Sequence, residues 1–334
     1  MPDFHDPYRF LLKFEVFYFK FKLSTTGIRK LYPHPLHTNT TFISERMISM
    51  AESKTVLVSG ATGQQGGAVA RELLKKGYTV KAMTRNPESE KAKELVKLGA
   101  QVVKGDLNDE GSLKTALTGV WGAFAVQNTW EAGVEGEEEQ GKRFARIAKE
   151  AGVQHFVYTS VGSAHEKTGI PHFDNKFRVE ETVKSLGFPS FVILRPAFFF
   201  ENWTWGWFKP AIDQGNVAVP LKPETKLQMI AVEDIGKYGA WAFDNAAALN
   251  GREIDIAGDS LTMPETAKVL SEVKGKQVGF FRVPIEEVRK SSEDFALMME
   301  WFDKKGYSAN IPERSKEAGI RPTSFSEWAK KMSW

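Results

Sequence analysis

Three evenly spaced glycines, Gly60, Gly63 and Gly66, give the clearest chemical signal in this sequence. They follow the β-branched run at 55–59 and open a stretch with helical periodicity at 64–76. At such a turn the backbone can approach a pyrophosphate, whose charge the helix dipole and unpaired N–H groups stabilise. A plain tight turn or another nucleotide site could use the same glycines. The strand before them and the βα series after them favour a dinucleotide.

The residues after the next predicted strand, 78–83, bear on which dinucleotide would bind. An NAD site usually has an acid there, which accepts hydrogen bonds from the ribose 2′-hydroxyl. This chain has Arg85 and Asn86 instead. A guanidinium can donate two charge-assisted bonds to a 2′-phosphate, so the sequence predicts NADP(H). The alternative is a solvated surface arginine.

Polar residues follow the third and fourth predicted strands, 100–104 and 121–126. Asp106, followed by Leu107, could cap the next turn or accept a hydrogen bond from the adenine amino group. The run 127–129 lies where the cofactor ribose and nicotinamide would pass, although simple turn chemistry would also explain it. We expect these side chains at the carboxyl edge of the sheet.

Two other groups have less specific explanations. The acidic run at 135–140 opens a predicted helix, where the macrodipole favours carboxylates, so we expect a solvated helix start and no metal site. Trp203, Trp205 and Trp207 could stack on an aromatic substrate, but the core of a small domain is the favoured use.

Strands and helices alternate through the first part of the body, which predicts an α/β fold with a doubly wound parallel Rossmann sheet. The Rossmann domain is expected over 51–200, and a smaller, interleaved α+β region over 201–334 should close the cleft as a substrate lid. Further strands are predicted at 155–160, 191–195, 227–232 and 253–257, and helices at 88–98, 109–118, 135–151, 172–186, from Asp234, 264–274 and 284–305.

Composition limits location and partners. Residues 1–46 hold seven Lys and Arg against four Asp and Glu, which accounts for the whole net charge of +3, so the body lacks the basic excess of a nucleic-acid-binding protein. We expect residues 1–50 to lie outside the fold. Residues 1–46 could be an organelle leader, a disordered tail or upstream sequence translated in the prediction of the start codon, and we favour the last of these. The apolar stretch 10–23 is interrupted by charges, so no membrane span is predicted. With no cysteine, a cytoplasmic and possible nuclear location is expected, or a mitochondrial one if 1–46 is a leader.

Several stretches together resemble the NmrA-like family of atypical short-chain dehydrogenase/reductase proteins. They are Q-N-T-W-E (127–131), E-E-E-Q-G-K (137–142), H-F-V-Y-T-S (155–160), H-F-D-N-K-x-x-V-E (172–180) and L-R-P-A-F-F-F-E-N-W (194–203). The resemblance covers about residues 54–300 and implies bound NADP(H). The residues it assigns to the cofactor, together with those argued above, are Gly60, Ala61, Thr62, Gly63, Gln64, Gln65, Gly66, Arg85, Asn86, Asp106, Leu107, Gln127, Asn128, Thr129, Lys176, Phe199, Phe200, Glu201 and Asn202.

One departure from the superfamily pattern leaves the activity open. Ordinary members carry Tyr-x-x-x-Lys, but His172 stands four residues before Lys176, and Tyr158 lacks the spacing to substitute. The resemblance therefore implies either an NADPH-dependent reductase of a quinone, enone or other small electrophile, or a redox sensor that contacts a regulatory protein. We favour the reductase, with Lys176 and His172 as its candidate catalytic residues and the proton coming from His172 or water. The alternative for His172 is a helix-surface or capping histidine, which explains this residue without chemistry. The sequence does not indicate an oligomeric state.

Overall fold

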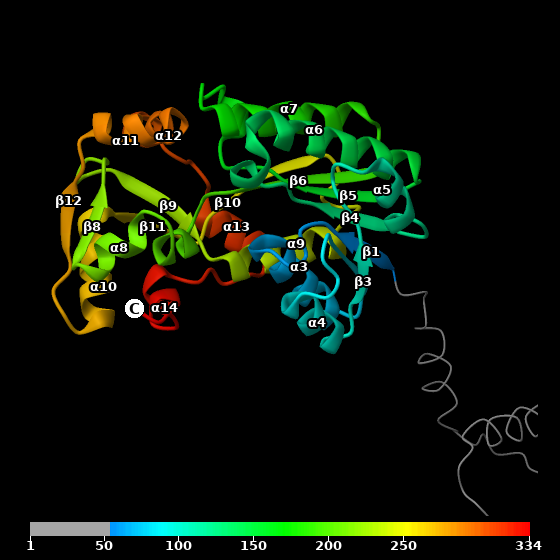
Figure 1. Cartoon of the computed structure of the whole chain (residues 1–334), viewed down its shortest axis with the longest axis horizontal. Helices are drawn as coiled ribbons and strands as arrows, with labels where there is room; N and C mark the ends of the chain where they lie inside the picture. The colour runs from blue at the N-terminus through cyan, green and yellow to red at the C-terminus, as the bar shows by residue number, and fades with distance from the viewer. Residues whose placement is uncertain (1–53) are drawn as a thin grey trace, which may run out of the picture. The chain divides into compact units, whose positions relative to one another are not determined.

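A computed structural model describes residues 54–334, and the expectations for residues 1–50 lie outside this part of the chain. The centre is a seven-stranded parallel sheet with the order β10-β6-β5-β4-β1-β2-β3 (Figure 1). Its strands are β1 Thr55–Val58, β2 Thr79–Thr84, β3 Gln101–Lys104, β4 Gly122–Ala125, β5 His155–Thr159, β6 Ser190–Pro196 and β10 Arg252–Ile256. The predicted Rossmann-type α/β fold is confirmed.

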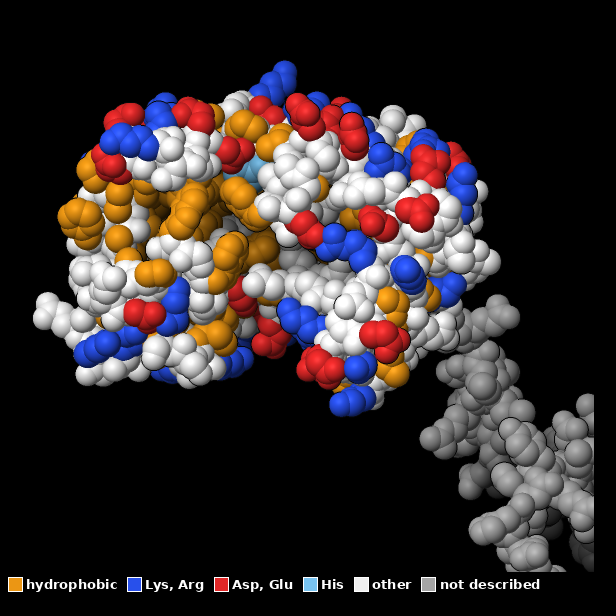
Figure 2. Space-filling view, in the orientation of Figure 1, with side chains coloured by type: hydrophobic (Ala, Val, Ile, Leu, Met, Phe, Trp, Pro, Cys, Tyr) orange, Lys and Arg blue, Asp and Glu red, His pale blue; other side chains and the backbone are white. Residues whose placement is uncertain are grey.

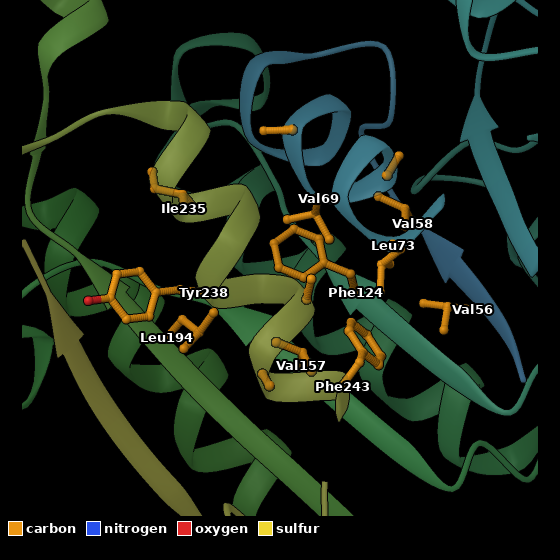
Figure 3. Packing of buried hydrophobic residues seen from close by; sticks show 14 of the residues in the cluster. Val56, Val58, Val69, Leu73, Phe124, Val157, Leu194, Ile235, Tyr238 and Phe243 are labelled. Atoms are coloured by element: carbon orange, nitrogen blue, oxygen red, sulfur yellow. The ribbon is translucent and has the colours of Figure 1, made fainter. Parts of the chain in front are cut away.

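Helices cover both faces of this sheet because side chains on a strand point alternately to opposite faces. Val56 and Val58 pack on one side, where α3 and α9 bury their apolar stripes, while Leu57 packs on the other against α5, α6 and α7. Figure 3 shows part of the first layer, with Val69 of α3 and Phe243 of α9 near the β4 strand. The main helices are α3 Gln64–Lys75, α4 Glu90–Lys97, α5 Glu110–Ala116, α6 Thr129–Glu150, α7 Pro171–Ser185 and α9 Val232–Asp244.

The C-terminal part of the chain contributes to both the main sheet and a smaller region. Strand β10 pairs with β6, and α9 packs on α3, so residues 201–334 are interleaved with the Rossmann layers. The smaller region has its own apolar core around Phe198, Trp203 and Phe302. Its elements are β7 Phe198–Phe199, β8 Asn216–Val219, β9 Lys226–Ile230, β11 Asp259–Thr262, β12 Gly279–Arg282, the 3-10 helix η2 Phe200–Thr204, and α8 Phe208–Asp213, α10 Met263–Lys274, α11 Ile285–Ser291, α12 Glu293–Lys304 and α14 Phe325–Ala329. Two further elements contribute no residue to this core: the 3-10 helix η1 Ala164–Glu166 contacts α7, and α13 Ile311–Ala318 ends at Ala318, which packs against the layer of α3 and α9.

Two predicted helices differ from the observed ones. The helix expected at 284–305 is divided into α11 and α12, because Ser292 is extended and its side chain caps α12 by accepting from the Phe295 N–H at 3.2 Å. The helix expected from residue 135 begins at Thr129 and is kinked at Gly133, whose φ is 74°. Within 54–334, no helix is both long and apolar enough to span a bilayer.

Candidate functional site

The glycine turn between β1 and α3 has the close backbone packing that a phosphate site needs. Gly60 has φ +56°, a conformation that favours glycine. A Cβ on Gly66 would lie 2.4 Å from the Gly60 carbonyl oxygen, so only glycine fits there. Gly63 caps α3 without any side-chain hydrogen bond, which leaves the start of this helix to backbone donors. The predicted turn is present with backbone donors free of side-chain caps, and its role in holding a pyrophosphate stays a prediction.

Side chains tie this turn to the neighbouring strands. The Thr159 hydroxyl, at the end of β5, donates to Gln65 Oε1 at 2.8 Å. The Thr62 and Thr84 hydroxyl oxygens lie 3.4 Å apart and join the turn to the end of β2. The structure thus gathers these chain segments at the carboxyl edge of the parallel sheet, where ligands of open α/β folds bind.

Arg85 lies just beyond β2 with its side chain exposed, and it forms an ion pair with Glu131 in the first turn of α6. Sequence reasoning did not foresee this partner. The Asn86 side chain accepts from the Glu88 N–H at 3.1 Å and stabilises the local turn. A 2′-phosphate at Arg85 would have to compete with the Glu131 carboxylate.

Two of the polar residues after the strands serve local turns. Asp106 Oδ1 accepts from the Asn108 N–H at 2.8 Å, so the capping alternative accounts for its present contact. Asn128 caps α6 by accepting from the Trp130 N–H at 3.1 Å. The Leu107 carbonyl accepts from Arg143 at 3.0 Å.

Gln127 differs from these residues because its side chain is buried and neither of its polar atoms has a partner. The hydroxyl groups of Tyr158 and Ser160, on β5 and just beyond it, are likewise buried and unpartnered. Burial raises the pKa of Tyr158 well above its ordinary value. Unpaired buried polar groups are costly, and they concentrate here around the carboxyl ends of β4 and β5.

The acidic run at 135–140 is solvated as expected at Glu135 and Glu139, but the expectation is wrong at Glu137. Glu137 is 1% exposed instead of solvated. It forms an ion pair with Lys176 and accepts from Asn175 Nδ2 at 2.9 Å and from the Thr129 hydroxyl. Burial works to raise the pKa of Glu137, but the charge of Lys176 and these hydrogen bonds outweigh it and hold the pKa below its usual range.

A signal for this burial was present in the sequence. Positions 137, 141, 144 and 148 are all buried and share one face of α6, since they recur at helical spacing. Glu137 is the acid on an otherwise apolar stripe. A buried acid on such a stripe requires a cation, and Lys176 of α7 provides it.

His172 occupies the second position of α7, one turn before Lys176, so the two side chains share a face of the helix. It is 7% exposed, which excludes a freely solvated surface histidine. The backbone N–H of His172 donates to Asp294 Oδ2 at 3.0 Å, and its ring Nδ1 bonds to Asp294 Oδ1. The ring of Trp130 lies 5.6 Å from the imidazole. No sequence pattern pointed to Asp294.

Residues 199–202 join the smaller region to the rest of the body. Phe200 is buried against Phe325 and Trp328, with the Phe325 ring centroid 5.3 Å away. Glu201 accepts from the Val232 N–H and from the Trp328 indole, each at 3.1 Å, and burial raises its pKa. Phe200 and Glu201 therefore have partners within the protein. Phe199 is half-buried and packs against the core under α3 and α9, and Asn202 is half-buried.

The tryptophans separate into core and surface. Trp203 is buried in the favoured core position, but Trp205 and Trp207 are 50% and 57% exposed. Trp207 meets Phe295 of α12 edge-on, with ring centroids 4.9 Å apart, and Phe208 packs near the same ring. Apolar side chains line a hollow between the region of α8 and β9 and the helices α11 and α12 (Figure 2). Asp294 and Phe295, adjacent on α12, connect His172 with this aromatic group.

Comparison with known proteins identifies the family. The model of the NmrA-like family matches residues 52–329, which is most of the chain. This chain belongs to the NmrA-like family. An NmrA-like family domain-containing protein from Dictyostelium discoideum is 30% identical over 84% of this chain and 99% of its own length. An NmrA-like oxidoreductase, himF of Aspergillus japonicus, is 30% identical over 67% of this chain and 74% of its own length.

Solved structures share the NmrA-like fold. Triphenylmethane reductase of Citrobacter sp., complexed with NADP(H), has a TM-score of 0.71 at 23% identity and covers 84% of this chain and 99% of its own. The Escherichia coli quinone oxidoreductase QOR2 with NADPH has a TM-score of 0.69 at 25% identity, over 83% and 98%. The negative transcriptional regulator NmrA with NADP has a TM-score of 0.70 at 21% identity, over 84% and 95%. The family thus includes oxidoreductases, and the fold also serves a regulator.

Proposed function

We propose that this protein is an NADPH-dependent reductase of a flat, uncharged electrophile such as a quinone or an enone. The observation that carries the proposal is that helix α12 contacts both His172 and the aromatic side chains of Trp207 and Phe208. Asp294 holds His172 on α7, and the next residue, Phe295, packs on Trp207 and Phe208. Helix α12 also borders the apolar hollow (Figure 2). An apolar hollow beside ionisable groups suits a substrate whose rings are buried against apolar side chains and whose carbonyl oxygen is polarised by a nearby polar group.

The cofactor assignment rests on the glycine turn and on the charges around it. The backbone of residues 60–66 would hold the pyrophosphate, and Arg85 the 2′-phosphate, once it leaves Glu131. Lys176, fixed by Glu137, would donate to the nicotinamide ribose. NADPH, when bound, supplies the hydride. Oxidoreductase relatives and neighbours solved with NADP(H) support this choice.

The proposal is tested by NADPH consumption with purified protein and a panel of quinones, enones and aldehydes. Turnover above the non-enzymatic rate is expected for planar quinones or enones. Gly63→Trp, which fills the phosphate turn, should abolish it, because a Cβ at Gly63 already lies 3.2 Å from the Gly60 carbonyl oxygen. Silence across the panel with NADPH still bound would contradict the proposal. Protein-partner binding that differs between NADPH and NADP⁺ would then favour the sensor.

A further inference from the structure

Asp294 contacts His172 at two points. One carboxylate oxygen accepts from the backbone N–H at 3.0 Å, and the other bonds to ring Nδ1. The two residues lie 122 positions apart and belong to different helices, α7 and α12. Asp294 is in the first turn of α12, where the helix dipole stabilises a carboxylate.

This arrangement determines how the imidazole can act. A carboxylate only accepts hydrogen bonds, so the Nδ1 that faces Asp294 carries a proton. The second ring nitrogen, Nε2, is then the atom left for a substrate, and it donates a proton only from the doubly protonated ring. The tilted ring of Trp130 and the edge-on contact with Phe173, at 4.8 Å between centroids, further restrict the orientation of the imidazole.

We propose that Asp294 is a positioning residue, which aligns His172 so that its Nε2–H delivers a proton to the oxygen of the reduced substrate. The inference rests on the proposed reductase function. It adds a residue from α12, the helix whose next side chain, Phe295, packs edge-on against Trp207.

The proton balance of the step is simple. The hydride brings two electrons and one hydrogen to the electrophile, which leaves a negative charge on its oxygen. The Nε2–H bond of the imidazolium breaks as the O–H bond forms, and the neutral ring regains one proton from water. Asp294 takes no part in the proton transfer and only orients the ring, as the carboxylate of a His–Asp pair does.

The test is a double-mutant cycle on quinone turnover. Asp294→Asn is expected to lower kcat by about tenfold or more, since a general acid contributes about 10²- to 10⁴-fold and this change disturbs its alignment. In a His172→Gln background the same substitution should change kcat by less than about twofold, because the group it positions is gone. The NADPH Kd should stay within about twofold in every variant.

Asp303→Asn is the matched control. Asp303 lies on the same helix and anchors it by accepting from the Lys222 N–H at 3.0 Å and the Thr225 hydroxyl at 2.6 Å. This variant should lower Tm while leaving kcat within about twofold. Glu at position 294 (D294E) should restore part of the lost activity.

The outcomes separate the two claims. An active wild type in which Asp294→Asn has no effect, or has the same effect with and without His172, refutes the positioning role alone. A kcat loss in Asp303→Asn equal to that in Asp294→Asn shows that α12 docking is the cause, and also refutes it. A wild type silent on the whole panel overturns the proposed function and this role together.

Discussion

The ion pair between Glu137 and Lys176 gives the sharpest prediction about this protein. Glu137→Gln removes one charge from a pair whose side chains are 1% and 13% exposed. Breaking a buried ion pair by removing one partner costs about 3 to 5 kcal/mol. The glutamine can still accept from Asn175 or Thr129, and Lys176 keeps some water contact, so we expect a smaller loss of unfolding free energy, about 2 to 3 kcal/mol.

Neighbouring Glu138 provides a matched control. Its side chain is 17% exposed and pairs with Arg178 and Lys142, which are 50% and 41% exposed. Pairs with such solvated partners contribute at most about 1 kcal/mol. In urea unfolding at pH 7, Glu137→Gln should therefore have a clearly lower free energy of unfolding than Glu138→Gln. In thermal unfolding, Glu137→Gln should lower Tm by roughly 4 to 12 °C.

The pH dependence follows from the lowered pKa of Glu137. A carboxyl whose folded-state pKa lies below its unfolded value stabilises the fold above the unfolded pKa and loses this contribution as pH falls through the folded one. The difference in free energy of unfolding between wild type and Glu137→Gln should be largest at pH 7 and should narrow as pH falls below 4.5, the ordinary pKa of a glutamate. Equal stabilities of Glu137→Gln and Glu138→Gln at pH 7, or a gap that widens in acid, would refute the reasoning.

Three other predictions concern the cofactor and the chain's beginning. Arg85→Ala should weaken NADPH binding by about tenfold, since one charge-assisted phosphate contact is lost, and should leave the NADH affinity unchanged. Glu131→Gln should tighten NADPH binding by up to about fivefold. Fluorescence titration measures both affinities, and an equal change in NADPH and NADH affinity would contradict this. Gly66→Ala should abolish NADPH binding and lower Tm, because its Cβ would lie 2.4 Å from the Gly60 carbonyl oxygen. The control Gly136→Ala, whose Cβ would meet Ala132 at 3.4 Å inside α6, should keep NADPH binding and raise Tm slightly. Similar effects of the two substitutions on binding and Tm would contradict the prediction. Deleting residues 1–46 should leave Tm and NADPH affinity unchanged, and a fall in either would show that the segment packs on the body.

Much of the architecture could be predicted because its signals are local. The six parallel strands from residue 55 to 196 and the helices between them follow from apolar periodicity and from glycines at helix ends. The glycine turn was recognisable because its positive φ at Gly60 and its close packing at Gly66 require glycines at fixed spacing. Strands β7, β8, β11 and β12 were missed. They are as short as β1, β3 and β4, but they belong to the smaller mixed region, where no regular alternation of strands and helices marks their positions.

The chemistry of the site was less accessible to sequence reasoning. The sequence by itself determined the turn at 60–66, the cation at Arg85 and the one-turn spacing of His172 and Lys176, since each is a local pattern along the chain. Only the tertiary structure decided that Glu137 holds Lys176, that Glu131 faces Arg85 and that Asp294 fixes His172. Those partners lie 39, 46 and 122 residues apart, and no periodicity within one element shows which helix will pack against another.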